Sequence, residues 1–554
     1  MNRKNGTSIL IFLAALFAFV PMLGSVHLFD WDEINFAEAA REMLLTGEYT
    51  QVQIGFEPFW EKPPLFIWLQ AICMHLFGIS EFSARLPNAI AGAISLTLLY
   101  RLGNKWRNHQ FGLIWSAIYA ASFLPQFYFR SGIIDPWFNL FIFLGIERLI
   151  AATETKMVRS GPVMVSGLWV GLAVITKGPA ALVIVSAIAL VYLVIKWQSL
   201  KFSWFQPLLF LLIVVTIGFS WFIYELLAGN EKMVHDFVEY NIRLITKSEA
   251  GHGQPFYYHA VVLLIGCFPM SLLFLFGLKR KKFKLLKEMD HHRFWMLIMF
   301  WVVLIIFSVV KTKIIHYSSL TYFPMSFIAA TVLYRWWVRE SKPKPIERRA
   351  ILVQAIVLGI VIFLAGNFEW IQNIILSKNW FSDQNVLDAI SIRANWNGWE
   401  WIPGLILIVG SYTAIYKLKI GNYRNGISIL ISTSFLTIWL TSLLIMPRVE
   451  EFTQNGIIEF YKEKGAEGAY CKPLGFHSYA HLFYGDRHPD QHKSATNDNW
   501  LLDEKIDRPV FFTVRNRNLE GLLKHQPELV VLGQWGSFTF LTRGDENYPF
   551  LAEP

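Results

Sequence analysis

The stretch TSILIFLAALFAFVPMLGSVHLFDWDEINF, residues 7–36, joins a long apolar run directly to a cluster of acidic residues. Its apolar part is long enough to cross the hydrocarbon core of a bilayer, which takes roughly 17–25 residues. A short basic N-terminus precedes the run, and no small-residue cleavage site follows before Asp30, so we predict an uncleaved anchor that begins in the cytoplasm. The chain then brings Asp32 and Glu33 to the membrane surface, where burial in lipid alone would not put charge.

The composition of the whole chain is that of an integral membrane protein. Its 554 residues are 54% hydrophobic and 16% charged, with a mean hydropathy of +0.38, which is far from the balance of a soluble protein. Apolar stretches of spanning length recur up to residue 446, whereas the sequence beyond it is typical of a soluble protein. We therefore predict an all-α polytopic membrane domain, residues 1–447, followed by a small C-terminal domain, residues 448–554.

The formal charge of +9 does not indicate a nucleic-acid partner. The basic residues cluster in short loops between apolar stretches, for example KRKKFKLLK at 279–287, and this pattern is typical of membrane topology. The three cysteines, Cys73, Cys267 and Cys471, lie far apart in the chain, so the sequence predicts neither a disulfide framework nor a zinc finger.

Six basic loops determine the predicted topology, because cytoplasmic loops carry an excess of Lys and Arg. All six are cytoplasmic only if the short apolar segment 63–79, interrupted by Gln70 and His75, lies at the outer surface instead of crossing. About thirteen spans then remain, and the C-terminal domain emerges on the periplasmic side of the inner membrane. The predicted spans are residues 7–28, 82–102, 109–128, 134–153, 160–176, 178–196, 205–228, 259–278, 294–310, 317–337, 350–366, 401–417 and 427–446.

Two predicted periplasmic loops, residues 29–81 and 229–258, are long for connectors, and loops of that length are usually functional. Within the first, residues 33–45 place apolar side chains on one side and charged ones, such as Glu38 and Arg41, on the other. This spacing predicts a juxtamembrane helix that lies on the membrane surface.

The C-terminal domain contains two strand-like runs, residues 508–514 and 528–543. They predict a small α/β or α+β fold. No motif in this domain indicates chemistry.

Asp32 and Glu33 at the head of the surface helix are the candidate catalytic residues. One interpretation of Asp32 is an N-cap, since a carboxylate there accepts hydrogen bonds from unpaired first-turn amides. The other is a general base that removes a proton from an acceptor hydroxyl. The two roles are compatible.

Glu61 and Lys62 precede two prolines, which hold the backbone in a stiff, extended path. One interpretation is an exposed ion pair of little energetic worth. In the functional alternative, Lys62 holds a phosphate while Glu61 steers an acceptor or binds a divalent cation.

Further cations fall at the outer ends of spans. A helix stop with a snorkelling side chain accounts for Lys177 alone, and an ordinary turn accounts for Arg130 with Asp135. Anchoring of helix ends at the membrane surface does not as easily explain the whole group of outer lysines, which also includes Lys313. Because lysines bind phosphate as point charges, the group predicts a site for a lipid phosphate whose tail lies between the helices.

Six motifs follow one another over most of the first 330 residues: DWDEINFAEAAREMLLTGEY, EPFWEKPPLFIWLQ, FSARLPNAIAG, RSGIIDP, TKGPAA and KTKIIHYSSLTYFP. In these motifs the chain resembles the integral-membrane GT-C glycosyltransferases of the protein O-mannosyltransferase superfamily, and most closely the bacterial branch that contains the lipid A aminoarabinose transferases. The resemblance implies a GT-C fold and transfer of a sugar from a polyprenyl phosphate to an acceptor outside the membrane, with inversion at the anomeric carbon.

The resemblance also implies roles for individual residues. It matches Asp32 to the acidic residue proposed as base and Lys62 to a lysine associated with the donor phosphate. It matches Glu61 to a glutamate associated with a divalent metal in the aminoarabinose branch. The other matched site positions are Asp135, Lys177, Lys313 and Tyr317.

The chain departs from the aminoarabinose transferases at two motifs. Asn35 and Phe36 stand where those enzymes often have Arg and Tyr, and Ile315 replaces a loop proline. These departures bear on the particular sugar and acceptor, and leave the predicted fold and type of donor unchanged.

We predict an inverting glycosyltransferase of the inner membrane that moves a hexose or pentose from a polyprenyl phosphate to a hydroxyl or phosphate of a lipid A-like or other envelope glycan. Asp32 deprotonates the acceptor, and the donor phosphate is bound by the outer cations and Tyr317. No cofactor is required beyond the option of a divalent metal at Glu61. The alternative, a transporter or flippase of a lipid-linked or anionic solute, would carry polar residues near the bilayer midplane.

Overall fold

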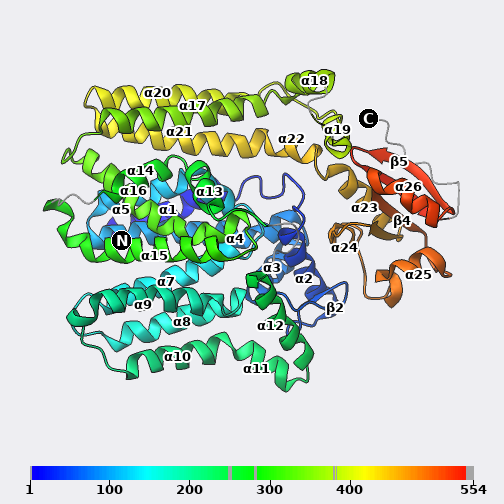
Figure 1. Ribbon diagram of the computed structural model, residues 1–554, viewed down its shortest axis with the longest axis horizontal. Coiled ribbons are helices and arrows are strands. Elements are labelled where there is room, and N and C mark those ends of the chain that lie inside the picture. Colours follow the sequence, from blue (N-terminus) through cyan, green and yellow to red (C-terminus); the bar gives the residue numbers. More distant parts are fainter. Residues whose placement is uncertain (1–2, 247–252, 280–283, 379–380, 382, 544–554) are drawn as a thin grey trace.

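The computed structural model describes residues 3–246, 253–279, 284–378, 381 and 383–543. A bundle of long helices lies at one end of the molecule and a small sheet with short helices at the other, and α2 and α3 lie between them (Figure 1). Parts of the predicted loop 229–258, of the basic segment 279–287 and of the C-terminal domain lie outside the described residues.

Helices occupy every predicted span. They are α1 (Arg3–Phe19), α4 (Glu81–Trp106), α5 (His109–Ala120), α6 (Phe123–Tyr128), α7 (Asp135–Ala152), α8 (Ser160–Lys177), α9 (Ala180–Lys196), α10 (Phe205–Gly218), α11 (Ser220–Leu227), α13 (Tyr258–Gly266), α14 (Met270–Leu278), α15 (Asp290–Val309), α16 (Tyr322–Trp337), α17 (Pro345–Ala365), α20 (Ile402–Lys419) and α21 (Tyr423–Leu444). Among the described residues, six helices are long and apolar enough to cross a membrane, or eight if two bent pairs are each one span.

The two bent pairs differ from the straight spans that the hydropathy pattern predicts. The helices α10 and α11 meet at 51°, whereas α13 and α14 meet at 114°, so residues 259–278 do not form one straight helix. The apolar pattern alone does not reveal such a break, because both halves are equally hydrophobic. The total of thirteen spans therefore stays a prediction.

Three short helices gather at the end of the bundle nearest the sheet: α2 (Asp32–Thr46), α3 (Leu65–Phe77) and α12 (Glu231–Thr246) (Figure 1). A two-stranded ribbon, β1 (Gln53–Ile54) and β2 (Glu57–Pro58), connects α2 to α3. The helix α3 is shorter than a spanning helix needs, as expected for the segment 63–79.

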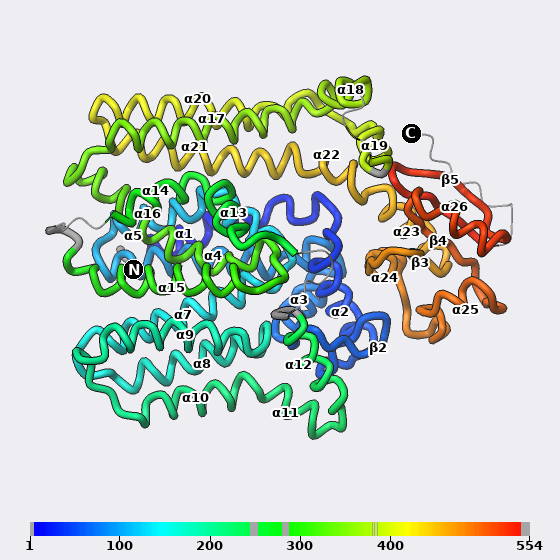
Figure 2. The backbone as a smooth tube through the Cα atoms, viewed as in Figure 1, coloured from blue at the N-terminus to red at the C-terminus, as the bar shows by residue number. Residues whose placement is uncertain are grey.

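The helix α2 matches the predicted residues 33–45 closely, but its charged side is buried. Glu38 and Glu42 are both fully buried and Arg41 is 2% exposed. The prediction of a helix with one face in water is wrong here, because segments of the C-terminal domain cover that face (Figure 2).

The C-terminal unit contains a four-stranded mixed sheet in the order β3-β4-β6-β5. The strands are β3 (Tyr470–Leu474), β4 (Val510–Arg515), β5 (Leu529–Trp535) and β6 (Phe538–Arg543). The pair β3 and β4 is parallel, and the other two pairs are antiparallel. The predicted strand 508–514 is β4, and the run 528–543 is a hairpin of two strands, so the predicted mixed fold is confirmed.

Short helices cover this sheet and connect it to the bundle. They are α18 (Phe368–Lys378), α19 (Gln384–Ile390), α22 (Met446–Glu451), α23 (Asn455–Ala466), α24 (Ala480–Phe483), α25 (Asp498–Asp503) and α26 (Asn516–His525). The ring of Phe460 in α23 stacks on Phe540 of β6 with the centroids 4.3 Å apart, which places the core of this unit between α23 and the sheet.

Candidate functional site

Asp32 is the first residue of α2, and Trp31 occupies the N-cap position without a side-chain cap hydrogen bond. The N-cap interpretation of Asp32 is therefore wrong. Its side chain is 31% exposed and lies 3.4 Å from Nε2 of His316. A carboxylate that caps no helix and remains accessible to solvent is available to accept a proton.

His316 connects Asp32 to a second carboxylate. Its Nε2 atom lies 3.6 Å from Oδ2 of Asp135, which is only 5% exposed. The other oxygen of Asp135 accepts a hydrogen bond of 2.6 Å from Nζ of Lys177. Groups that are distant in sequence thus alternate along one chain of contacts, Asp32, His316, Asp135 and Lys177, which we call the acid–cation chain.

Helix ends position the members of this chain. Asp135 begins α7 next to a proline, and Lys177 ends α8. The residue after Lys177 is Gly178, with φ +97°, and a Cβ atom there would lie 2.8 Å from the ring of Phe237. Glycine is therefore required both by the backbone conformation and by the close approach of α12.

Tyr317 and Phe138 flank the ammonium group of Lys177. Its Nζ atom lies 5.0 Å from the ring centroid of Tyr317 and 5.7 Å from that of Phe138. Aromatic faces attract cations at these distances. Two of the predicted site residues, Lys177 and Tyr317, are thus adjacent in the structure.

Glu61 and Lys62 lie beside the acid–cation chain. Nζ of Lys62 is 3.7 Å from a carboxylate oxygen of Glu61 and 5.0 Å from the ring centroid of Tyr240 in α12. Burial raises the pKa of the Tyr240 hydroxyl, and the carboxylate of Glu61 raises it further. The long segment 229–258 therefore contributes a wall of the site, as its length suggested.

The charges around Lys62 act on one another. Burial lowers the pKa of the Lys62 ammonium, and the nearby Lys177 lowers it further, while the carboxylates of Glu61, Asp32 and Asp135 oppose the change. Charged groups from the segment before α3, from the starts of α2 and α7 and from the end of α8 therefore influence one another.

Glu33, the second candidate catalytic residue, lies in a different environment. Its carboxylate pairs with Arg85 at 2.7 Å and accepts hydrogen bonds from the amides of Phe29 and Gly132. Arg85 also donates to the carbonyls of Leu23, Val26 and His27. This buried group fixes the chain segment that leads into Asp32, and its carboxylate oxygens are already occupied by donors.

Two predicted phosphate ligands stand outside the acid–cation chain. Arg130 donates to the carbonyl of Ala18 at the end of α1, and among the described residues its Nε and Nη1 atoms have no hydrogen-bond partner. Lys313 is buried and donates to the carbonyl of Val310 at 2.7 Å. Both remain candidates without a contact to Asp32 or Asp135 among the residues that the structure describes.

The described residues do not build a metal site around Glu61. Within the described ranges, the group of three potential ligand atoms close enough to hold one ion is His235, Asp236 and Glu239 on α12, and two of these residues are exposed. The nearest charged partner of Glu61 is the ammonium of Lys62, which disfavours a cation. The donor set that the described residues offer at Glu61 therefore does not fit a divalent metal.

Two residues, His316 and Tyr240, were not predicted from the sequence as members of the site. His316 directly precedes Tyr317 in the motif KTKIIHYSS, so its position in the motif was the available signal. Tyr240 lies on a helix without any motif, and only the fold brings it to Lys62. A third contribution, from the C-terminal unit, was not predicted at all.

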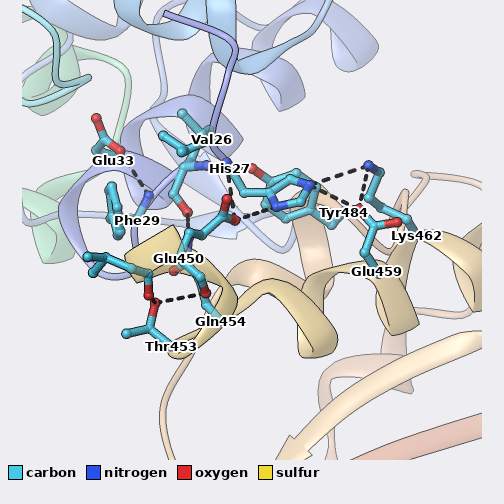
Figure 3. A network of polar contacts seen from close by, with 12 residues as sticks. Val26, His27, Phe29, Glu33, Glu450, Thr453, Gln454, Glu459, Lys462 and Tyr484 are labelled. Atoms are coloured by element: carbon cyan, nitrogen blue, oxygen red, sulfur yellow. Dashed lines mark hydrogen bonds and ion pairs between the residues drawn. The ribbon is translucent and has the colours of Figure 1, made fainter. Parts of the chain in front are cut away.

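The C-terminal unit holds the segment before Asp32 by several polar contacts (Figure 3). His27 contacts Glu450 through its backbone amide and its ring, and the ring also lies 3.1 Å from Glu459. The amide of Leu28 donates to the hydroxyl of Tyr484 at 2.7 Å. These contacts, more than four hundred residues apart in sequence, fix where α2 begins.

The geometry combines three chemical capacities. It offers an accessible carboxylate, a buried carboxylate that holds a histidine and a lysine in place, and two lysines around one space. Such a site can remove a proton from one group while it stabilises negative charge on another. That combination suits the displacement of an anionic leaving group.

One family and several individual proteins match the chain. The family described as dolichyl-phosphate-mannose-protein mannosyltransferase matches residues 61–224. An undecaprenyl phosphate-alpha-4-amino-4-deoxy-L-arabinose arabinosyl transferase of Proteus mirabilis is 27% identical over 344 residues, which span 61% of this chain and 61% of that protein. A protein of the same description from Yersinia pestis is 24% identical over 95% of this chain and 96% of its own length.

A solved structure has the same architecture over nearly the whole chain. The crystal structure of ArnT from Cupriavidus metallidurans bound to undecaprenyl phosphate superimposes with a TM-score of 0.76, with 16% sequence identity and 99% of each chain covered. At this identity the likeness shows a common fold, including the small C-terminal sheet, and the expected fold class is confirmed to that extent.

Proposed function

Given that the chain belongs to the superfamily of GT-C integral-membrane glycosyltransferases that includes the protein mannosyltransferases and the aminoarabinose transferases, we propose that it transfers a sugar from a polyprenyl phosphate to an acceptor on the periplasmic side of the inner membrane. The donor is an undecaprenyl phosphate-linked sugar, with a pentose of the aminoarabinose type as the first candidate. The acceptor is a lipid A-like envelope glycolipid. These assignments rest on the names of the similar proteins and on the chemistry of the site.

In the proposed reaction, Asp32 accepts the proton of the acceptor hydroxyl as the oxygen attacks the anomeric carbon of the donor. The bond from that carbon to the phosphate oxygen breaks, and the polyprenyl phosphate leaves with the electron pair. A single displacement of this kind inverts the anomeric configuration. The exposure of Asp32, compared with the burial of Asp135, supports Asp32 as the base.

Lys62 and Lys177 stabilise the departing phosphate, because the charges of the two ammonium groups act on one another and charge stabilisation lowers the barrier to its departure. Asp135 and His316 are positioning residues, since each contacts another charged member of the acid–cation chain. Glu33 supports the segment before Asp32 through Arg85. Arg130, Lys313 and Tyr317 remain proposed contacts of the donor phosphate, and Glu61 of the acceptor.

The main observation that supports this proposal is the acid–cation chain from Asp32 to Lys177. Its test uses purified protein in nanodiscs, a panel of undecaprenyl-phosphate sugars and lipid A as acceptor. We expect Asp32→Asn to reduce sugar transfer at least about 100-fold, the usual scale for a lost general base, while undecaprenyl phosphate still binds. Glu57→Gln, which changes an exposed carboxylate of the same segment, is the control.

Unchanged transfer by the Asp32→Asn protein would refute the assignment of the base. If the wild-type protein consumed no donor and instead moved lipid across the bilayer, and Asp32→Asn did not slow that movement, the flippase alternative would replace the proposal. A glycosyltransferase and a flippase thus give different results with the same variant.

A further inference from the structure

Three aromatic side chains meet at the N-cap of α2, next to the proposed base. Trp31 directly precedes Asp32 in the chain. Its ring centroid lies 6.2 Å from that of His477 and 5.8 Å from that of Tyr479. The latter two belong to the segment between β3 and α24 of the C-terminal unit. We call Trp31, His477 and Tyr479 the aromatic platform.

The platform is exposed in a part of the molecule that is otherwise well packed. Trp31 is 41% exposed, although the α2 residues 33–43 that follow it are all buried. Among the described residues, no hydrogen bond to the indole N–H of Trp31 is found, so one polar donor and one ring face are available. His477 is exposed and Tyr479 is half-buried.

Polar contacts hold the two halves of the platform together. Burial raises the pKa of the Asp30 carboxylate, and the hydroxyl of Ser478 and the backbone amide of Tyr479, which face it, oppose the change. The segment that carries His477 therefore lies against the residue that precedes Trp31. A platform fixed in this way loses little conformational freedom when it binds a ligand.

The platform borders the proposed site on the side of the carboxylates. Burial raises the pKa of the Tyr479 hydroxyl, and the charges of the Glu61 and Asp30 carboxylates raise it further. Asp32 is the neighbour of Trp31 in the chain. The donor phosphate belongs at Lys62 and Lys177, so a molecule on the platform approaches from the acceptor side.

The chemistry of the platform suits a saccharide ring. One face of a pyranose presents C–H groups that pack on an indole or phenol ring, while its hydroxyls at the edge need hydrogen-bond partners. The platform offers both, with the Asp30 carboxylate, the His477 ring and the indole N–H at its edge. Neither an acyl chain nor an extended peptide needs this combination, since the first needs an apolar groove and the second needs paired backbone groups.

We propose that Trp31, His477 and Tyr479 form the acceptor subsite and stack a sugar ring of the acceptor beside Asp32. This inference rests on the proposed glycosyl transfer and adds that the acceptor is recognised through a carbohydrate ring by residues of both the membrane bundle and the C-terminal unit. Trp31 supplies the stacking surface, and Tyr479 places a second ring against it.

The test compares Trp31→Ala, Trp31→Phe and Tyr479→Phe with the wild-type protein in nanodiscs, with lipid A as acceptor. We expect Trp31→Ala to raise the acceptor KM about tenfold or more, the effect of one lost aromatic contact, with the donor KM unchanged. Trp31→Phe, which keeps a ring, should recover most of the loss, and Tyr479→Phe should stay close to wild type. Trp370→Ala removes another exposed indole, far along the chain, and is the control.

A second measurement does not depend on turnover. A soluble glucosamine disaccharide bisphosphate is titrated into each protein and its contacts are followed by saturation-transfer NMR. Magnetisation transfer from the protein to the ring C–H protons that is lost in Trp31→Ala supports the subsite. This holds even if no sugar is transferred to lipid A, and in that case only the proposed function fails. Normal transfer to lipid A with an unchanged acceptor KM in Trp31→Ala would overturn the subsite and leave the proposed function intact.

Discussion

Burial changes the pKa of Lys62, one residue of the site. Its side chain is only 15% exposed, and its ammonium lies near the carboxylate of Glu61 and the ring of Tyr240. A lysine in ordinary solvent keeps its charge up to a pH of about 10.4. Because burial lowers the pKa of Lys62, its charge is lost at a lower pH than that.

The consequence is a pH dependence of donor binding. Lys62 is cationic below its pKa and neutral above it, so we expect the affinity for undecaprenyl phosphate to fall as the pH rises from 7.5 towards 10. Lys62→Arg keeps a charge that does not titrate in this range, and its affinity should stay constant. Binding is measured by titration of the lipid into protein in nanodiscs. A parallel decline in both proteins would assign the effect to another group.

At the scale of the element, α2 carries Asp32 and is held by an unusual set of buried charges. Arg41 forms an ion pair of 2.8 Å with Glu38, and both side chains are buried. The neighbouring Glu42 accepts hydrogen bonds from the amides of Gly55 and Phe56. Burial and the charge of Glu38 raise the pKa of Glu42 to about 9, so it is protonated at neutral pH.

This proton links the stability of α2 to pH. The unfolded chain releases the Glu42 proton near pH 4.5, whereas the folded protein holds it up to about pH 9. The folded state binds more protons between these values, so its stability falls as the pH rises through this window, by at most about 1.4 kcal/mol per pH unit. We expect Glu42→Gln to flatten the dependence of the apparent Tm on pH. Glu57→Gln, which alters an exposed carboxylate, should retain the wild-type slope.

At the scale of the whole molecule, the C-terminal unit acts as a clamp on α2. Arg41 donates to the carbonyls of Leu482 and Arg487 and lies 3.2 Å from Asp486, while His27 contacts Glu450 before the helix begins. The segment that contains Asp32 is therefore held from both sides by a unit whose sequence contains no catalytic motif.

The clamp predicts a large effect of one substitution. Arg41→Ala leaves Glu38 buried without its partner, and breaking such a pair typically costs about 3–5 kcal/mol of stability. We expect a lower apparent Tm and slower sugar transfer, because the start of α2 is no longer fixed. Arg508→Ala, which removes a surface pair with Asp490, should change stability by about 1 kcal/mol or less. Equal effects of the two substitutions would contradict the clamp.

The predicted orientation in the membrane is also a property of the whole molecule. The native cysteines are all buried, so a single introduced cysteine reports its own exposure. We expect a membrane-impermeant maleimide to label Glu520→Cys in intact spheroplasts, and to label Ser199→Cys only after lysis. Both positions are exposed in the structure. Labelling with the reverse pattern would invert the predicted topology, with the N-terminus and the basic loops outside.

The sequence by itself determined the membrane class, the positions of the helices and most members of the site, because each leaves a local signal. Apolar runs of spanning length identify helices whatever their neighbours are, and motifs such as EKPP and TKGP place Lys62 and Lys177 at helix ends. The strand runs 508–514 and 528–543 likewise predicted β4, β5 and β6 of the C-terminal sheet, whereas β3 was not predicted.

Only the tertiary structure decided how these residues act on one another. The 114° break between α13 and α14, the contacts of His316 with Asp32 and Asp135, and the approach of Tyr240 to Lys62 depend on elements distant in the chain. Burial likewise reversed the expected exposure of Arg41 and left Trp31 open. Electrostatic strength and exposure depend on the local dielectric and on which surfaces meet, and these are set by packing, which no single stretch of sequence encodes.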